Sequence, residues 1–178
     1  MKKITKRGIK SKTISQKENV NPDVRKNHYT DEELVKYCIS KMDFDKSDMV
    51  LDVGAGINKV WFNNIPTSKK DWCEIELGID FFDYNKEVDW CIGNPPFREL
   101  WDVIKKSCDL SNKGFAYLMA IDGINRLTPK RLSYIKEKGF YIQNINVVCC
   151  KRWFGRYFFV IFSKQPNKFM EWSNVNYE

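Results

Sequence analysis

An apolar run that ends in a glycine-rich turn places the strongest constraint on the fold of this chain. Residues 48–53 (Asp-Met-Val-Leu-Asp-Val) are typical of a buried strand, and residues 54–58 (Gly-Ala-Gly-Ile-Asn) follow directly, before a short helical segment. Glycine takes positive φ angles and lets the backbone come close to a ligand. The order strand, glycine turn, helix therefore predicts an α/β fold with a binding site at the turn. A glycine turn alone also occurs in nicotinamide-cofactor folds and in plain loops.

A second apolar run, residues 88–93, ends in Asn94-Pro95-Pro96-Phe97. The run predicts another buried strand, so these four residues are expected at its carboxyl end, where open α/β sheets hold their ligands. The prolines fix φ and remove two backbone donors, which leaves the Asn94 and Pro95 carbonyls as acceptors beside the Asn94 amide. Such acceptors suit a planar aromatic NH2 group, on whose ring Phe97 could stack. The structural alternative is a Pro-Pro turn after a core strand.

Residues 94–97 match the whole Asn/Asp-Pro-Pro-aromatic motif of N6-adenine methyltransferases, which the sequence therefore resembles. Asp52, Gly54 and Gly56 are similar to the Asp-x-Gly-x-Gly-x-Gly turn of class I S-adenosylmethionine-dependent methyltransferases, with Asn58 in place of the third glycine. Asparagine tolerates left-handed geometry, so we expect the turn to survive. A Rossmann dehydrogenase would need the third glycine and would not need the Asn-Pro-Pro-Phe stretch.

The resemblance also implies an acid that holds the ribose of the cofactor. This architecture uses a carboxylate about 20 residues after the glycine turn to accept the ribose hydroxyls. Residues 71–76 predict the second strand, and Glu74 is the first choice for this acid, with Glu76 the second. Strand alternation puts both on one face, so spacing does not separate them. An acid exposed on the surface is the alternative.

Two further elements resemble cofactor contacts of the family. Asp80 and Phe81 resemble its Asp-Phe element, in which the carboxylate accepts from the adenine amino group and the ring packs on the base. Tyr29 and Thr30 resemble an aromatic-Thr element that touches the methionine end of S-adenosylmethionine. Thr30 also fits an ordinary capping box, as the N-cap of a helix over about residues 31–42, and Phe81 fits a plain core position.

The spacing between Glu76 and Asp80 predicts a trimmed sheet. Three residues lie between them, too few for the crossover that joins parallel strands, so the usual third strand and its helix should be missing or vestigial. The remaining patterns predict helices over residues 99–110 and 129–138, a strand over 114–121, and an antiparallel pair over 140–149 and 157–162. The expected fold class is α/β, a Rossmann-like, doubly wound methyltransferase sheet with a terminal antiparallel hairpin.

The loop between the last two predicted strands holds two large aromatic residues among basic ones. At this place the methyltransferase family carries an aromatic that stacks on the flipped base. Stacking combined with phosphate contacts is a general mode of nucleic-acid binding. The resemblance thus assigns nucleic-acid binding to Lys151, Arg152, Trp153, Phe154 and Arg156. Burial of the two aromatics for structural reasons is the alternative.

The net charge of +7 comes entirely from the amino-terminal part of the chain. Residues 1–28 contain nine Lys or Arg and two acids, whereas the other 150 residues contain 21 of each sign. Residues 1–27 show no apolar periodicity and predict a basic flexible arm before a methyltransferase domain over residues 28–178. Such an arm either binds phosphate backbones without reading sequence or only keeps the protein soluble.

Residue usage argues against metal and membrane functions. Six cysteines without a Cys-x-x-Cys spacing and a single histidine offer few ligands to zinc, so no metal is expected. The sequence has no apolar run of about 18 residues and no secretory signal pattern. We therefore expect a reduced, cytoplasmic protein that does not bind membranes.

The expected function is S-adenosylmethionine-dependent methyl transfer to the N6 amine of adenine in nucleic acid, with DNA favoured over RNA. Because 81 residues follow Phe97, no separate target-recognition domain is expected, and selectivity would be low or supplied by a protein partner. An RNA adenine N6-methyltransferase is the first alternative. The glutamine methyltransferases of release factors share Asn-Pro-Pro-Tyr, but the basic arm disfavours them. A degenerate methyltransferase fold that only binds nucleic acid or a partner is the last alternative.

Overall fold

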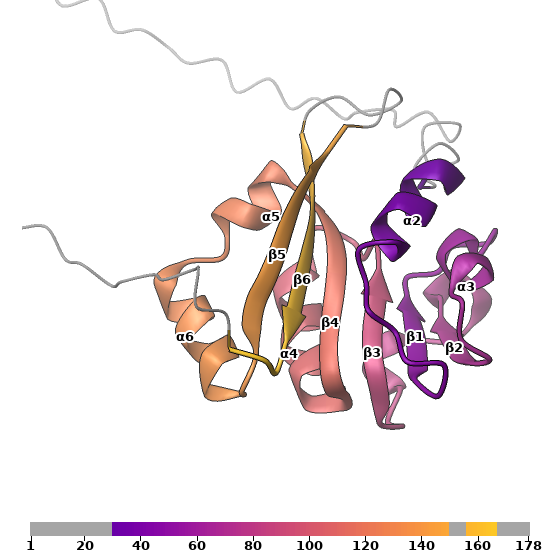
Figure 1. Ribbon diagram of the computed structural model, residues 1–178, viewed down its shortest axis with the longest axis horizontal. Coiled ribbons are helices and arrows are strands. Elements are labelled where there is room, and N and C mark those ends of the chain that lie inside the picture. Colours follow the sequence, from indigo (N-terminus) through magenta and orange to yellow (C-terminus); the bar gives the residue numbers. More distant parts are fainter. Residues whose placement is uncertain (1–29, 150–155, 167–178) are drawn as a thin grey trace, which may run out of the picture.

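A computed structural model describes residues 30–149 and 156–166. Within them, six strands form one sheet in the order β2-β1-β3-β4-β6-β5 (Figure 1). The strands are β1 (Met49–Val53), β2 (Lys69–Cys73), β3 (Val88–Gly93), β4 (Ser111–Ala120), β5 (Tyr141–Val148) and β6 (Tyr157–Ser163). β1 to β4 pair in parallel, whereas β6 is antiparallel to both β4 and β5. The predicted α/β sheet with a terminal antiparallel hairpin is confirmed.

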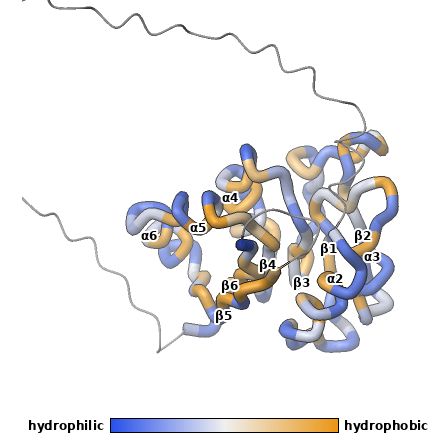
Figure 2. The backbone as a smooth tube through the Cα atoms, turned by 90° about the horizontal axis from the view of Figure 1, so that it is seen from above, coloured by the Kyte–Doolittle hydropathy of each residue, from blue (hydrophilic) through white to orange (hydrophobic). Residues whose placement is uncertain are grey.

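Helices cover both faces of this sheet, as the doubly wound prediction requires. They are α2 (Glu32–Ile39), α3 (Val60–Asn64), α4 (Leu100–Leu110), α5 (Ile121–Asn125) and α6 (Pro129–Glu137). Because strand side chains alternate, Leu51 and Val53 pack in the core under α4 and α6, while Val50 packs in the opposite core under α2 and α3. Seen from above, much of the tube at β4, β5 and β6 has hydrophobic colour (Figure 2).

The third strand is missing, as the short spacing predicted. Between β2 and β3 the chain forms two single-turn 3-10 helices, η1 (Ile75–Leu77) and η2 (Phe81–Asp83), and one isolated bridge between Glu74 and Ile79. β2 is consequently an edge strand. Several large apolar side chains beyond it are exposed, Ile75 to 70% and Phe82 to 40%.

The second strand ends earlier than predicted. The sequence indicated a strand up to Glu76, whereas β2 ends at Cys73. The Cys73 carbonyl accepts hydrogen bonds from the amides of Gly54 and Ala55 at 3.1 and 3.0 Å. These bonds to the glycine turn end the pairing of β2 with β1. The chain then turns into η1, with Glu74 as its N-cap. The expectation that Glu74 and Glu76 share a strand face was wrong.

The first described helix also differs from its prediction. Asp31, not Thr30, is the N-cap of α2, because the Asp31 carboxylate accepts from the Glu33 amide at 3.0 Å. The helix ends at Ile39 instead of near residue 42. Thr30 is therefore not used for capping, and its hydroxyl contacts other parts of the fold.

The glycine turn departs from expectation at its third position. Gly54 and Gly56 have positive φ angles of 73° and 65°, which glycine adopts without strain. Among the non-glycine residues that the structure describes, only Lys59 has a positive φ, 49°, and it stands directly before α3. Lys59, and not Asn58, therefore takes the left-handed position.

Two expectations from composition can be compared with the fold. No helix among the described residues is both long enough and apolar enough to cross a membrane. The cysteines within these residues are free thiols, and all but Cys149 are buried.

Candidate active site

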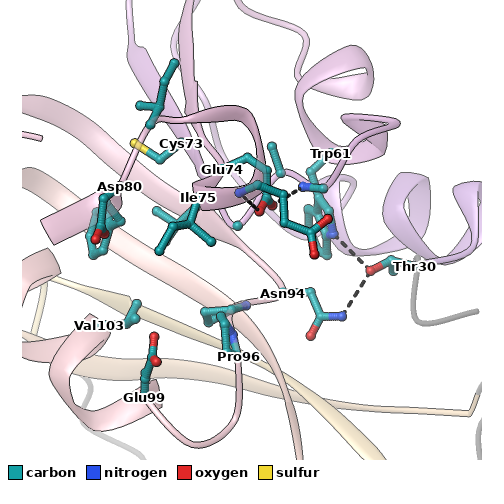
Figure 3. Close-up of a pocket in the computed structure, with 18 of the residues that line it drawn as sticks. Thr30, Trp61, Cys73, Glu74, Ile75, Asp80, Asn94, Pro96, Glu99 and Val103 are labelled. Atoms are coloured by element: carbon teal, nitrogen blue, oxygen red, sulfur yellow. Dashed lines mark hydrogen bonds between the residues drawn. The ribbon is translucent and has the colours of Figure 1, made fainter. Parts of the chain in front are cut away.

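A cavity of about 580 Å³ opens at the carboxyl ends of β1, β2 and β3. Figure 3 shows Glu74 and Ile75 on one side of this cavity, with Asn94 and Pro96 on the other. The cavity brings together nearly all of the predicted site residues that the structure describes, namely Thr30, Gly54, Gly56, Glu74, Asp80, Phe81, Asn94, Pro95, Pro96 and Phe97. The motifs that the sequence separates by tens of residues thus share one site.

Gly54 brings the glycine turn against the Asn-Pro-Pro-Phe loop. A Cβ atom at this position would lie 3.6 Å from the Pro95 Cα and 3.7 Å from the Asn94 carbonyl oxygen. The two loops therefore pack backbone to backbone at the base of the cavity. A larger residue at Gly54 would fill the contact and would also have to adopt a φ of 73°.

Asp52 lies behind the glycine turn. Its side chain is fully buried and is not among the residues that line the cavity. Oδ2 accepts a hydrogen bond from the Phe62 amide at 2.9 Å, which ties α3 to β1, while Oδ1 has no partner. Burial raises the pKa of the Asp52 carboxyl to about 7; the nearby charge of Glu74 adds to this rise, and the Phe62 amide opposes it. A direct contact between Asp52 and a cofactor stays a prediction.

Glu74 lies at the mouth of the glycine turn. Oε2 accepts from the Gly56 amide at 2.7 Å, and Oε1 accepts from the Glu76 amide at 3.1 Å. The carboxylate is thereby held beside the turn, whereas the side chain of Glu76 is exposed at the rim. Asp80, which caps η2, and Glu99 add further carboxylates to the lining. None of the lining residues, all within the described ranges, is Lys or Arg, so the cavity favours a cationic ligand.

The Asn94 side chain combines one hydrogen bond with one unused acceptor. Gly93 precedes it with a φ of 144°, and a Cβ there would come within 2.5 Å of the Val53 carbonyl oxygen, so β3 is pressed against β1 up to its last residue. Asn94 Nδ2 donates to Thr30 Oγ1 at 3.2 Å. Asn94 Oδ1 is buried without a hydrogen-bond partner. Pro95 is buried, whereas Phe97 is 37% exposed, so its ring is accessible from the cavity.

Among the residues of the site that sequence reasoning missed, three make contacts with its predicted residues. Tyr157, the first residue of β6, lines the cavity with its ring centroid 6.3 Å from that of Phe97. Trp61 lies in α3, and its Nε1 donates to Thr30 Oγ1 at 3.3 Å. Arg126 Nη1 donates to the Phe97 carbonyl at 3.2 Å. Tyr157 could have been noticed, because it follows the aromatic and basic loop. Arg126 could not, because α5 has no clear sequence signal.

Several predicted site residues lie outside the described residues. These are Tyr29 and the loop residues Lys151, Arg152, Trp153 and Phe154; the predicted basic arm over residues 1–27 also lies outside them. Arg156 is described and exposed. The nucleic-acid contacts assigned to this loop stay predictions.

The chemistry available in the cavity is hydrogen bonding and charge. Burial raises the pKa of the Cys73 thiol to about 12, so this lining cysteine remains a thiol at neutral pH and is a poor nucleophile. Among the described residues, no group of three or more His, Cys, Asp or Glu side chains is placed to hold a metal ion. What the site offers is acceptors, carboxylates and aromatic faces.

No protein-family model and no curated protein sequence matches the chain. Solved structures do match it. A proposed RNA methyltransferase from Pyrococcus horikoshii superposes with a TM-score of 0.56 and 21% identity, over 76% of this chain and 82% of that chain. Precorrin-6y C5,15-methyltransferase from Geobacter metallireducens gives a TM-score of 0.54 and 14% identity, over 76% and 89% of the two chains.

An O-methyltransferase from Bacillus cereus, in complex with S-adenosylhomocysteine, gives a TM-score of 0.54 and 9% identity, over 79% of this chain and 86% of that chain. The chain has the Rossmann-like methyltransferase fold. At these identities the likeness establishes the fold, and the function has to be argued from the site.

Proposed function

We propose that this protein transfers a methyl group from S-adenosylmethionine to the N6 amine of adenine in nucleic acid. The observation that carries the proposal is the buried, unpartnered Oδ1 of Asn94 at one wall of the cavity, opposite Glu74. A buried acceptor without a partner costs free energy, and a target amine would satisfy it. The fold and the glycine turn make the same cavity suitable for the cofactor.

The lining residues fit S-adenosylmethionine in both size and charge. A volume of about 580 Å³ lies in the usual range of cofactor sites. The carboxylates of Glu74, Glu76 and Asp80 complement a cofactor that carries a sulfonium and an ammonium group. Glu74, fixed at the glycine turn, would accept the ribose hydroxyls, while Asp80 and Phe81 would contact the adenine. When bound, the cofactor supplies an electrophilic methyl group.

The Asn-Pro-Pro-Phe loop supplies what the target amine needs. Asn94 Oδ1 and the Pro95 carbonyl would accept its two hydrogens, which turns the nitrogen lone pair out of the ring and toward the cofactor side of the cavity. Phe97, with Tyr157 beside it, would stack on the base. The transfer would be a direct displacement at the methyl carbon. No side chain has to remove a proton first, because the nitrogen becomes acidic only after methylation.

DNA is the first candidate substrate, as the sequence analysis indicates, and RNA is the second. The second candidate is supported by the likeness to the proposed RNA methyltransferase from Pyrococcus horikoshii. In either duplex the adenine must leave the stack, at a cost of a few kcal/mol that stacking on Phe97 would offset. A protein partner would supply target recognition if the chain itself has little.

Nucleoside mass spectrometry tests this proposal. The protein is incubated with methyl-labelled S-adenosylmethionine and with single-stranded or duplex DNA or RNA, and the digested nucleosides are separated. We expect labelled N6-methyldeoxyadenosine from DNA. Labelled N6-methyladenosine from RNA alone would select the second candidate. Label on another atom would reject the N6 assignment, and cofactor binding without transfer to any substrate would indicate a degenerate methyltransferase fold.

A further inference from the structure

We propose that Thr30 is a positioning residue for catalysis, whose hydroxyl fixes the Asn94 amide with Oδ1, and not Nδ2, directed toward the target amine. The inference rests on the proposed function, because it concerns the orientation of the acceptor that would bind the amine. It assigns to Thr30 a role other than the cofactor contact that the sequence resemblance implied.

The hydrogen bonds around Thr30 connect three distant segments. Thr30 Oγ1 accepts from Trp61 Nε1 at 3.3 Å and from Asn94 Nδ2 at 3.2 Å, as the dashed lines in Figure 3 show. The three side chains come from the segment before α2, from α3 and from the loop after β3. All three line the cavity. A single hydroxyl thus joins the Asn-Pro-Pro-Phe loop to the helix that follows the glycine turn.

These contacts are sheltered from water and firmly anchored. Thr30 is 7% exposed and Trp61 is 2% exposed. The Trp61 ring stacks on Phe159 of β6, with centroids 5.8 Å apart and an interplanar angle of 29°. Because Trp61 is held by the sheet, the position of its N–H is fixed, and this fixes the Thr30 hydroxyl in turn.

The observed contacts define the orientation of the amide. An indole N–H only donates, so the Thr30 oxygen has to accept from Trp61. A hydroxyl oxygen has a second lone pair, which accepts from Asn94 Nδ2. With Nδ2 engaged, the other end of the amide, Oδ1, is left as the buried acceptor without a partner. In this arrangement the Thr30 oxygen holds Nδ2, a donor, away from the amine hydrogens, and Thr30→Val removes that contact.

A pair of substitutions at Thr30 tests the role directly. Thr30→Val keeps the shape of the side chain and removes the hydroxyl, whereas Thr30→Ser keeps the hydroxyl. At saturating cofactor and nucleic acid we expect Thr30→Val to lower kcat about tenfold, the effect of one hydrogen bond, and Thr30→Ser to stay within about threefold of wild type. Cofactor affinity by calorimetry should change less than about threefold in both variants.

The same Thr30 substitution, made in an Asn94→Asp variant, separates an orienting role of Thr30 from a purely structural one. Asn94→Asp offers an acceptor oxygen in either orientation, and the motif of the family admits Asp at this position. If Thr30 acts by orienting the amide, Thr30→Val should lower kcat less than about threefold when it is added to Asn94→Asp. If Asn94→Asp itself is inactive, the comparison of Thr30→Val with Thr30→Ser decides.

The outcomes distinguish the inference from the proposed function. An equal kcat for Thr30→Val and wild type, or weakened cofactor affinity with kcat retained at saturation, would overturn the inference alone. If Thr30→Val lowers kcat equally in the wild-type protein and in the Asn94→Asp variant, the inference is overturned as well. Absence of N6-methyladenine from the products of wild type would overturn the proposed function and the inference with it.

Discussion

The carboxyl ends of β2 and β3 face the same cavity but are built in different ways. At the end of β2, both carboxylate oxygens of Glu74 already accept hydrogen bonds, from the Gly56 and Glu76 amides. At the end of β3, the Asn94 side chain has one bonded end and one buried oxygen without a partner. The first arrangement fixes the carboxylate by bonds from within the protein and leaves each oxygen a second lone pair for a ligand. The second is complete only when another molecule supplies a donor.

The surroundings of the two strand ends explain this difference. β2 lies at the sheet edge, without a third strand beside it, and Ile75 and Phe82 beyond it are exposed. β3 lies between β1 and β4, where Gly93 leaves no space for a side chain. The edge is bounded by loops and two 3-10 turns, whereas the centre lies between two strands. We therefore propose that the edge binds the cofactor and that the centre orients the target amine.

The largest expected effect comes from Asn94→Ala. It should lower the rate of methyl transfer by about 100-fold or more, because in the proposed mechanism Asn94 binds the target amine in the transition state. Cofactor affinity, measured by calorimetry, should stay close to wild type. A drop in cofactor affinity as large as the drop in rate would show that the centre and the edge do not divide the work in this way.

Glu74→Ala should mainly affect cofactor affinity, and not the rate of methyl transfer. Loss of a charged acceptor at the glycine turn should weaken cofactor affinity by roughly tenfold or more. Glu76→Ala is the matched control, since its carboxylate is exposed at the rim, and it should change affinity less. If Glu76→Ala weakens binding and Glu74→Ala does not, the choice between these two acids is wrong.

Two glycine substitutions compare the rigidity of the strand ends. Gly93 and Gly78 both have positive φ angles, 144° and 80°, so an alanine is strained at either. Only at Gly93 would the new Cβ collide, within 2.5 Å of the Val53 carbonyl, whereas nothing lies within 4 Å at Gly78. We expect Gly78→Ala to cost about 1–2 kcal/mol of unfolding free energy and Gly93→Ala clearly more. Equal losses in denaturant melts would contradict the difference in packing.

The raised pKa of Asp52 gives a pH-dependent prediction. Folded Asp52 keeps its proton up to about pH 7, whereas in the unfolded chain its pKa is near 4. Between these values the folded state binds more protons, so this carboxyl should make the free energy of unfolding fall as pH rises from about 4 to about 7. Asp52→Asn, which can still accept from the Phe62 amide, should flatten that fall in denaturant melts. An identical pH slope in both proteins would mean that Asp52 is ionised in the fold.

The smallest effect is expected from removal of the basic arm over residues 1–27. Removal of residues 1–27 takes away nine cationic side chains and two acids, and the structure places the cavity beyond them. If several of the cations neutralise phosphates, the log-log salt dependence of nucleic-acid binding should become shallower by roughly 0.7–0.9 for each phosphate that is no longer neutralised. KM for nucleic acid should rise while kcat is largely kept. An unchanged salt slope would leave Arg156 and its loop as the remaining basic surface.

The fold was predictable wherever a local pattern decided it. β3 ends at Gly93 as expected, because two prolines follow closely and stop the ladder. α6 begins at Pro129 as expected, because proline suits a first helical turn. The missing third strand followed from chain length alone. The end of edge strand β2 was misplaced because the amides of Gly54 and Ala55 bond the Cys73 carbonyl. These amides belong to the turn after β1, which is distant in the sequence.

The site was predictable in its motifs but not in its contacts. Local sequence placed Gly54 and Asn94 directly after strands and Glu74 within one, and the sheet brought the three together. The bond from Asn94 to Thr30 spans 64 positions, and no local pattern contains it. The left-handed position lies at Lys59, directly before α3, and no local pattern indicated it in place of Asn58.

Methyl transfer to matched oligonucleotides tests the central claim most directly. One oligonucleotide contains adenine, and its partner has every adenine replaced by purine, which lacks the 6-amino group but keeps the ring. We expect wild type to transfer label from S-adenosylmethionine to the adenine oligonucleotide only, and Asn94→Ala to transfer it to neither. Equal labelling of the two oligonucleotides would contradict the assignment of the Asn-Pro-Pro-Phe loop to the adenine amine.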